Sequence, residues 1–232
     1  MGAVLEMMAM AKNTMMKLGL GIALALGLSA CGTMKQTDMG QDLAKSYLSK
    51  WKASDNKINR MPPDLLIQAR DKAPMLLATI EKHNVQGVLF EWRRNKDVIS
   101  WEALDDITLS WRDGVVVRTS GLVSDLSAAT TPSVSQLLAQ GSYQRQYVLL
   151  DGNDQSQTLT FACRSKVVGQ PQIQILDMRY ATRQVTEQCD DAKGQGLSIA
   201  NDYWIEGAGR IRKSRQWISP FVGYLVLEDL RR

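Results

Sequence analysis

The spacing of apolar residues divides the chain into an apolar run, a helical segment and a long region of strands. Residues 18–28 form an uncharged apolar run. After a polar stretch, Leu43, Tyr47 and Trp51 recur every four residues, which predicts an amphipathic helix. From about residue 74 the period falls to two, which is typical of strands with one buried face. The pattern therefore predicts a mainly β, antiparallel fold preceded by short N-terminal helices.

Alternation of apolar and polar residues locates the individual strands. The predicted strands are 85–92, 98–102, 107–111, 115–119, 141–150, 157–168, 173–177, 182–188, 197–205, 210–218 and 223–230. Asp113 with Gly114, and residues 207–209, predict tight hairpin turns. Residues 93–97 predict another turn. Residues 75–82 fit either a strand or one face of a helix.

Proline and small polar residues mark the segments between these regions. The pair Pro62–Pro63 predicts the start of a second short helix that extends to about residue 70. Residues 124–140 are rich in Ser, Ala and Thr, so we expect a linker or crossing loop with a helical turn at 134–139.

The strand region contains two weakly similar halves, about residues 74–126 and 141–232. In each half a Trp stands shortly before a Gly-containing turn, and a strand with an Arg follows the turn; the two tryptophans are Trp111 and Trp204. This similarity favours an internal duplication. Two unrelated hairpins would also share such a pattern.

The apolar run has the length of the hydrophobic region of a secretory signal, ~7–15 residues. It is shorter than the ~20 apolar residues of a membrane-spanning helix. Lys12 and Lys17 precede it, and Leu-Ser-Ala-Cys at residues 28–31 follows it. This tetrapeptide looks like a bacterial lipobox, in which small residues admit a peptidase and the thiol of Cys31 accepts diacylglycerol. The alternative is an ordinary signal with an incidental Cys.

The lipobox predicts the organisation and the location of the chain. Residues 1–30 are the predicted lipoprotein signal peptide, 31–40 a polar tether and 41–232 a β-rich domain. Several acyl chains on Cys31 would hold the chain on a membrane. Gly32 follows Cys31, whereas an Asp there usually signals inner-membrane retention, so we expect an outer-membrane lipoprotein facing the periplasm.

Composition excludes little else. The chain has 232 residues and a formal net charge of +4. This mild charge argues neither for nor against a nucleic-acid partner, and the predicted export argues against one. No apolar run after residue 31 is long enough to cross a membrane as a helix.

Two cysteines remain after Cys31 is assigned to lipid. Cys163 and Cys189 lie in strand-like segments of an exported chain, so a disulfide between them is predicted. Two free thiols or a metal pair are the alternatives. Because His83 is the only His, a zinc site would lack ligands, and we predict neither a metal nor a cofactor.

Catalytic motifs are absent from the sequence. It contains neither a Gly-x-Ser-x-Gly motif nor a phosphate-binding Gly loop. The adjacent pairs Asp105–Asp106 and Asp190–Asp191 would point to opposite faces if they lie on strands. We therefore predict no catalytic residues.

Two motifs resemble the YjbF/GfcB family of lipoproteins. The first is Trp-Arg-Asp-Gly-Val-Val-Val-Arg-Thr-Ser-Gly-Leu-Val-Ser-Asp-Leu at 111–126, and the second joins Asn-Asp-Tyr-Trp at 201–204 to the segment 209–220. The resemblance covers roughly 74–126 and 157–230, and the lipobox and the cysteine pair are consistent with it. It implies a curved, barrel-like β sheet without a recognised catalytic centre, on an outer-membrane lipoprotein encoded with genes for group 4 capsule or exopolysaccharide export.

The resemblance implies a function. We expect a non-enzymatic accessory factor in capsule or exopolysaccharide assembly or export, whose partners are the outer membrane, the polymer and proteins of the export machinery. Two alternatives from other classes are a periplasmic enzyme that modifies the polymer and a lipid or lipoprotein carrier with a half-barrel cavity.

The predicted closing hairpin supplies the candidate binding residues. Alternation would place Arg210 and Arg212 on one face of a strand, and Lys213 and Arg215 on the other. Such a strand suits a sheet edge or surface groove that meets an acidic polymer or partner, although charged residues also protect edge strands from aggregation. The candidate residues are Trp204, Arg210, Arg212, Lys213, Arg215 and Trp217.

Three further tryptophans are candidates for stacking on sugar rings. Trp92, Trp101 and Trp111 lie on successive predicted strands, and aromatic faces can stack on ligands. Packing in the hydrophobic core is the alternative.

Overall fold

The computed structural model describes residues 62–231 except residues 105, 151–154 and 195, and these residues belong to one compact unit, Leu43–Arg232. The predicted signal peptide, the tether, Cys31 and the predicted helix at residues 43–51 lie outside the described residues. No helix in the described part of the chain is long and apolar enough to cross a membrane.

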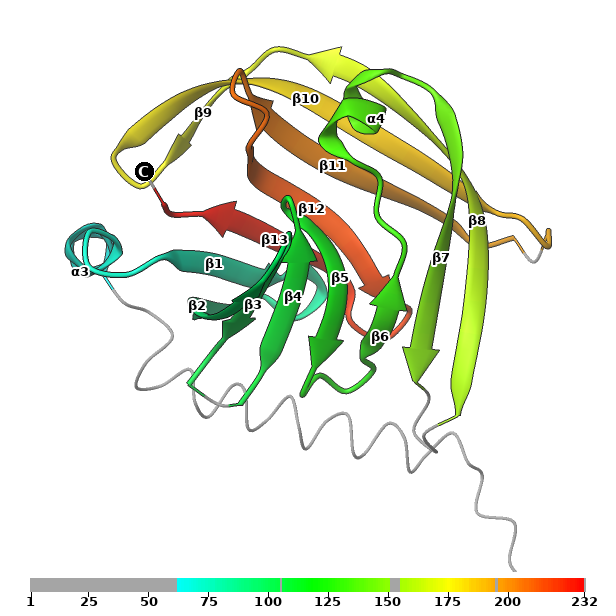
Figure 1. The fold of residues 1–232 in the computed structure, drawn as a ribbon, viewed down its shortest axis with the longest axis horizontal. Coiled ribbons are helices and arrows are strands. Elements are labelled where there is room, and N and C mark those ends of the chain that lie inside the picture. Colours follow the sequence, from blue (N-terminus) through cyan, green and yellow to red (C-terminus); the bar gives the residue numbers. More distant parts are fainter. Residues whose placement is uncertain (1–61, 105, 151–154, 195, 232) are drawn as a thin grey trace, which may run out of the picture. The chain divides into compact units, whose positions relative to one another are not determined.

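Figure 1 shows a strongly curved β sheet with short helices at its ends. The elements in chain order are α3 (Pro63–Arg70), β1 (Met75–Ile80), the 3₁₀ helix η1 (Glu81–His83), β2 (Val85–Asn95), β3 (Val98–Glu102), β4 (Thr108–Arg112), β5 (Val115–Ser120), β6 (Leu126–Ala129), α4 (Val134–Leu138), β7 (Ser142–Leu150), β8 (Ser156–Gly169), β9 (Gln172–Ile175), β10 (Met178–Asp191), β11 (Ser198–Glu206), β12 (Ile211–Ser219) and β13 (Gly223–Asp229).

Twelve of these strands form one antiparallel sheet in the order β5-β4-β3-β2-β1-β13-β12-β11-β10-β8-β7-β6, and β9 pairs with β10 alone. The two end strands approach each other through side chains. The Thr119 hydroxyl donates to Asp125 (2.9 Å) and accepts from the Leu126 backbone N–H (2.9 Å). The sheet is therefore a nearly closed barrel, which confirms the predicted mainly β, barrel-like fold.

The interior of the barrel is packed with apolar and aromatic side chains. Trp101 and Trp111 meet edge to face with ring centroids 5.1 Å apart, and both are buried. These two tryptophans confirm the core-packing alternative. Trp92 lies on the outer face of β2 and is 60% exposed.

The hairpin between β4 and β5 closes against β12. Asp113 and Gly114 both have positive φ angles (50° and 89°), as a two-residue hairpin turn requires. A Cβ atom on Gly114 would lie 2.8 Å from Cβ of Ile211, so this approach needs glycine. The Gln216 amide bridges the same strands, donating to Gly114 O (2.8 Å) and accepting from Val116 N (2.9 Å). The predicted hairpin is confirmed and is fixed to β12.

Several local predictions are settled by these elements. The ambiguous segment 75–82 contains a strand, β1, which pairs with both β2 and β13. The helix at 63–70 and the helical turn inside 134–139 are confirmed as α3 and α4. The side chains of Ser133 and Gln136 form a reciprocal capping box at the start of α4.

Two turn and linker predictions are wrong. β2 continues through Arg93, Arg94 and Asn95, so the turn is only Lys96–Asp97. The predicted linker 124–140 contains the strand β6, which pairs with β7. Residues 93–95 are exposed and polar, so their strand lacks the alternation that marks a buried face. β6 spans only four residues, of which Leu126 is buried and the others are small, so it is too short to show a period of two.

The predicted duplication stays a prediction. Residues 74–126 and 155–231 contribute to the same continuous sheet. The two tryptophans that suggested a repeat lie on opposite faces, because Trp111 is buried in the barrel and Trp204 is half-buried on the outer face of β11.

Candidate functional site

The predicted basic strand is β12, which lies between β11 and β13. The expectation of an edge strand is therefore wrong, since sequence alternation does not reveal how many neighbours a strand has. A bulge at Arg212, opposite Trp204 and Ile205, also breaks the alternation. Arg210 precedes the strand and is partly exposed, whereas Arg212 is buried, so the two do not share one exposed face.

The cations of β12 are engaged by carboxylates of the same chain. Arg212 Nε lies 2.8 Å from Glu206, and Lys213 Nζ lies 2.8 Å from Glu228. The Arg215 guanidinium contacts both oxygens of Glu81 at 2.7–3.0 Å.

These contacts change the electrostatics of the predicted site. The hydrogen bond from Arg215 lowers the pKa of Glu81, so this carboxylate stays ionised to lower pH than usual. Arg215 also stacks 3.5 Å from the ring centroid of Tyr224.

The structure brings together only part of the predicted binding set. Trp204 lies on the outer face with Lys213 Nζ 5.8 Å from its ring centroid. Trp217 is buried in the barrel, where its ring contacts Tyr147 and Phe161. The tryptophans that were expected to act together are therefore on opposite faces, and binding by this strand stays a prediction.

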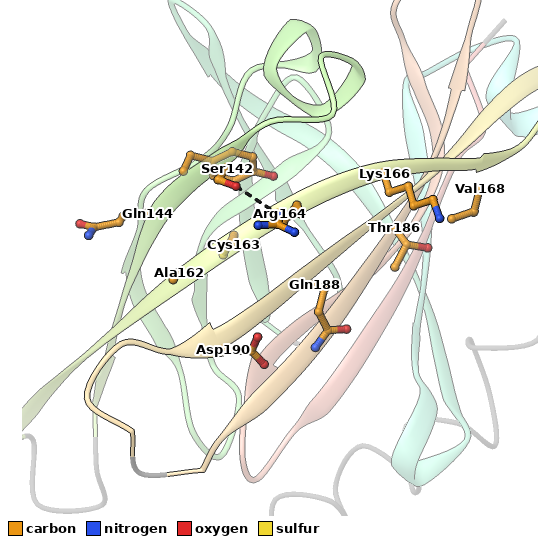
Figure 2. Close-up of a pocket in the computed structure, with 11 residues that line it drawn as sticks. Ser142, Gln144, Ala162, Cys163, Arg164, Lys166, Val168, Thr186, Gln188 and Asp190 are labelled. Carbon is orange, nitrogen blue, oxygen red and sulfur yellow. Dashed lines mark hydrogen bonds between the residues drawn. The ribbon is translucent and has the colours of Figure 1, made fainter.

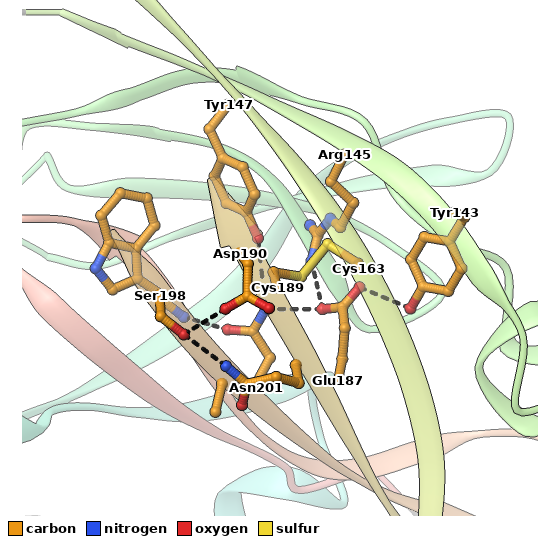
Figure 3. Close-up of a disulfide and its surroundings, with 12 residues drawn as sticks. Tyr143, Arg145, Tyr147, Cys163, Glu187, Cys189, Asp190, Ser198 and Asn201 are labelled. Atoms are coloured by element: carbon orange, nitrogen blue, oxygen red, sulfur yellow. Dashed lines mark hydrogen bonds and ion pairs between the residues drawn. A yellow bond between two sulfur atoms is a disulfide. The ribbon is translucent and has the colours of Figure 1, made fainter. Parts of the chain in front are cut away.

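A buried polar network, which we call the Glu187 cluster, crosses the barrel interior (Figure 3). It consists of Glu187 on β10, Tyr143 and Arg145 on β7, and Asn201 and Tyr203 on β11. The Glu187 carboxylate accepts hydrogen bonds from Tyr143 OH (2.7 Å), Arg145 Nη1 (2.8 Å), Asn201 Nδ2 (2.7 Å) and Tyr203 OH (3.1 Å). The side chains of Glu187 and Arg145 are 0% and 2% exposed.

The cluster ties together strands that are not all neighbours. Arg145 Nε donates to Thr130 O (3.0 Å), beyond β6. The Asn201 side-chain carbonyl accepts from Trp217 N on β12 (2.7 Å). Because four donors already engage the buried carboxylate, its role is to link β7, β10 and β11 inside the barrel.

The predicted disulfide is confirmed beside this cluster. Cys163 on β8 and Cys189 on β10 are direct cross-strand partners and form a disulfide inside the barrel. Their sulfur atoms and a Glu187 oxygen lie within 4.8 Å of one another. Since the two sulfurs are bonded to each other, they are not thiolate ligands for a metal.

The environment of the cluster shifts the ionisation of its tyrosines. Burial is the largest cause that raises the pKa of Tyr143 and Tyr203, and the negative charge of Glu187 adds to it. Burial also raises the pKa of Tyr147 from 10.0 to about 12, although the positive charge of Arg145 opposes it. All three side chains are therefore held as neutral phenols in the folded protein.

We expect an alkaline unfolding transition from these tyrosines. A group whose pKa is raised by folding contributes stability that is complete below its unfolded pKa and is lost as the pH rises through its folded pKa. Stability should therefore fall as the pH rises from 10.0 towards about 12, the interval for Tyr147. Tyrosinate absorbance and near-ultraviolet circular dichroism would follow ionisation and unfolding together. Full ionisation of every tyrosine near pH 10 in a chain with native circular dichroism would contradict this expectation.

A hollow of about 710 Å³ lies on the outer face of β7, β8 and β10 (Figure 2). We call it the polar hollow because most of its lining residues carry polar side chains, although much of the surface that they expose is the carbon of their stems. Ser142 and Gln144 line it from β7, Arg164 and Lys166 from β8, and Gln188 from β10. These side chains are exposed, because they alternate with residues that point into the barrel. Sequence reasoning missed this site. The sequence does show polar residues at every second position over much of the long strands. Only the pairing register shows that these polar residues of different strands lie side by side.

An interior cavity bears on the alternative of a lipid carrier. This cavity holds about 20 Å³ and is lined by residues such as Ala78, Leu89 and Leu225. Since one water molecule needs ~10–15 Å³ of such space, the cavity has room for about one water. This cavity therefore cannot hold an acyl chain.

Comparison with known proteins is consistent with this fold. The hypothetical lipoprotein YmcC from Escherichia coli (K12) has a similar solved structure, with a TM-score of 0.65, 14% sequence identity, and coverage of 79% of this chain and 93% of that chain. At this identity the likeness shows the fold alone. A search of curated proteins found no match.

A family model provides the assignment. The model described as "Group 4 capsule polysaccharide lipoprotein gfcB, YjbF" matches residues 48–230. This range includes nearly all of the described barrel and both motifs that resembled the family in the sequence. The chain therefore belongs to the YjbF/GfcB family of group 4 capsule polysaccharide lipoproteins.

Proposed function

We propose that this protein is an outer-membrane lipoprotein that faces the periplasm and acts as a non-enzymatic accessory factor in the assembly or export of a polysaccharide. The observation that carries the proposal is the family match over residues 48–230, whose description combines a capsule polysaccharide with a lipoprotein. The lipobox that ends at Cys31 supports the membrane anchor, and Gly32 supports the outer membrane.

The packing of the barrel supports a scaffold over a catalyst or a carrier. The buried carboxylate of Glu187 is already engaged by four donors, whereas a general acid or base must reach its substrate. The interior is filled by a core that includes Trp101, Phe161 and Trp217. The outer face of the barrel is therefore the surface that this proposal assigns to the polymer or to export proteins.

Complementation of a deletion strain tests the proposal. Loss of the gene should lower the amount of polysaccharide at the cell surface, and the wild-type gene should restore it. A Cys31→Ser variant should remain uncleaved or fail to reach the outer membrane, because its hydroxyl replaces the thiol that accepts lipid, and it should restore little polysaccharide. Fractionation with immunodetection and surface polysaccharide staining would measure both effects.

Two results would count against the proposal. Unchanged surface polysaccharide in the deletion strain would remove the export role. Normal outer-membrane fractionation of the Cys31→Ser variant would remove the lipid anchor.

A further inference from the structure

We propose that the polar hollow on the outer face of β7, β8 and β10 is a binding site for an anionic polysaccharide. This inference rests on the proposed function and names the surface and the charge class of the polymer. The site differs from the β12 strand that the sequence had suggested.

The charge of the hollow comes from two cations that have no carboxylate partner among the described residues. Arg164 and Lys166 are two residues apart on β8, so their side chains leave the same face roughly 7 Å apart. In the part of the chain that the structure describes, neither forms an ion pair, and Arg164 makes only a long contact from Nε to the Ser142 hydroxyl (3.4 Å). By contrast, Arg212, Lys213 and Arg215 each contact a carboxylate. The cations of the hollow therefore remain available to an anionic ligand.

The remaining polar groups suit hydroxyl-rich ligands. Ser142, Gln144 and Gln188 are exposed and line the hollow with hydroxyl and amide groups, which can both donate to and accept from sugar hydroxyls. Asp190 is the carboxylate among the lining residues, and it already accepts a hydrogen bond from Ser198 (2.8 Å). The two cations thus outnumber the one engaged carboxylate.

The surface lacks the large apolar anchors of a typical protein interface. Val168 is its exposed large apolar side chain, and the aromatic Tyr143 donates its hydroxyl inward to Glu187. Protein-binding hot spots are usually buried aromatic or Arg anchors in apolar surroundings. Shallow polar contacts that repeat along a polymer fit this hollow better, because many weak contacts on one chain reinforce one another.

The floor of the hollow is held in one shape. Arg164 on β8 lies opposite Gln188 on β10, and the next pair along the two strands is Cys163 with Cys189. The disulfide therefore joins β8 and β10 one residue away from Arg164, on the opposite face of the sheet. A rigid floor keeps the polar groups in place before the ligand arrives, which lowers the entropic cost of binding.

Charge reversal inside and outside the hollow tests this site. The lipidated mature protein in neutral detergent would be titrated with polygalacturonate, an acidic polysaccharide, and with dextran, a neutral one. The double variant Arg164→Glu/Lys166→Glu should bind polygalacturonate at least about tenfold more weakly than the wild type. The matched control is Lys72→Glu/Lys82→Glu, which changes the net charge by the same amount. Lys72 follows α3, Lys82 lies in η1, and both are exposed. This control variant should bind polygalacturonate like the wild type. Dextran should bind more weakly than polygalacturonate, and salt should weaken the binding of polygalacturonate.

Three results would overturn the site. One is that the hollow variant, with a native circular dichroism spectrum, binds polygalacturonate as tightly as the wild type does. Another is the absence of polygalacturonate binding by the wild type. The third is binding of poly-L-glutamate as tight as that of polygalacturonate and equally lost in the hollow variant, since it would assign the hollow to an acidic protein segment.

Complementation separates the failure of this site from the failure of the proposed function. If the hollow variant reaches the outer membrane and restores surface polysaccharide fully, the hollow is not the polymer site, and the export role stands. If deletion of the gene leaves surface polysaccharide unchanged, the export role itself fails. We expect the hollow variant to reach the outer membrane and to restore less polysaccharide than the control variant.

Discussion

Replacement of Arg145 by methionine is expected to lower the free energy of unfolding by about 3–5 kcal/mol. Arg145 is the cationic partner of Glu187 at 2.8 Å, and both side chains are buried. Removal of the guanidinium would leave a carboxylate in the barrel interior without its compensating charge, and it would free the Thr130 carbonyl that Arg145 Nε engages. The desolvation cost of the remaining charge makes this loss large.

An exposed ion pair provides the control for this variant. Arg112 Nε lies 2.6 Å from Asp97, but the side chains are 44% and 55% exposed, so solvent screens their interaction. Arg112→Met should cost less than about 1 kcal/mol. Urea unfolding of the two variants would compare the losses, and equal midpoints for Arg145→Met and Arg112→Met would contradict the structural role of the Glu187 cluster.

Removal of the disulfide is expected to have the second largest effect, a loss of about 3 kcal/mol. Cys163 and Cys189 are 26 residues apart in sequence, and the bond restricts that loop in the unfolded chain. The double variant Cys163→Ala/Cys189→Ala should unfold at a lower urea concentration than the oxidised wild type.

Reductant provides the matched control for the disulfide. A reducing agent should lower the unfolding midpoint of the wild type towards that of the double variant and should leave the double variant unchanged. A reductant-insensitive wild type, or Cys163 and Cys189 recovered as free thiols from the native protein, would contradict the bond.

The alternation of apolar and polar residues predicted the strands wherever one face of the sheet is buried. β11 shows why, because its residues alternate regularly between buried and half-buried or exposed positions. The same reasoning failed at Arg93–Asn95, where the strand carries exposed polar residues, and at β6, which has only four residues and one buried side chain, Leu126. It also could not show that β12 has a neighbouring strand on each side, because the order of strands in a sheet depends on contacts between residues that are distant in sequence.

The Glu187 cluster could not be predicted without knowing how the strands pair. Period-two alternation places Val185, Glu187 and Cys189 on one face of β10, so a charged residue on the buried face was detectable in the sequence. Its partners could not be identified in this way. Arg145 and Tyr143 lie 42 and 44 residues before Glu187, and only the pairing of β7 with β8 and of β8 with β10 brings them to it. The disulfide was predictable because its logic depends on compartment and cysteine number, which the sequence contains.

The amount, location and sugar composition of the polysaccharide in a deletion strain test the central claim most directly. A non-enzymatic export factor should leave the composition of the polymer unchanged while the polymer is depleted from the cell surface and retained within the cell. Complementation with the wild-type gene should return the polymer to the surface. An altered sugar composition or substitution pattern would instead indicate an enzyme that modifies the polymer, and an unchanged surface amount would contradict the export role.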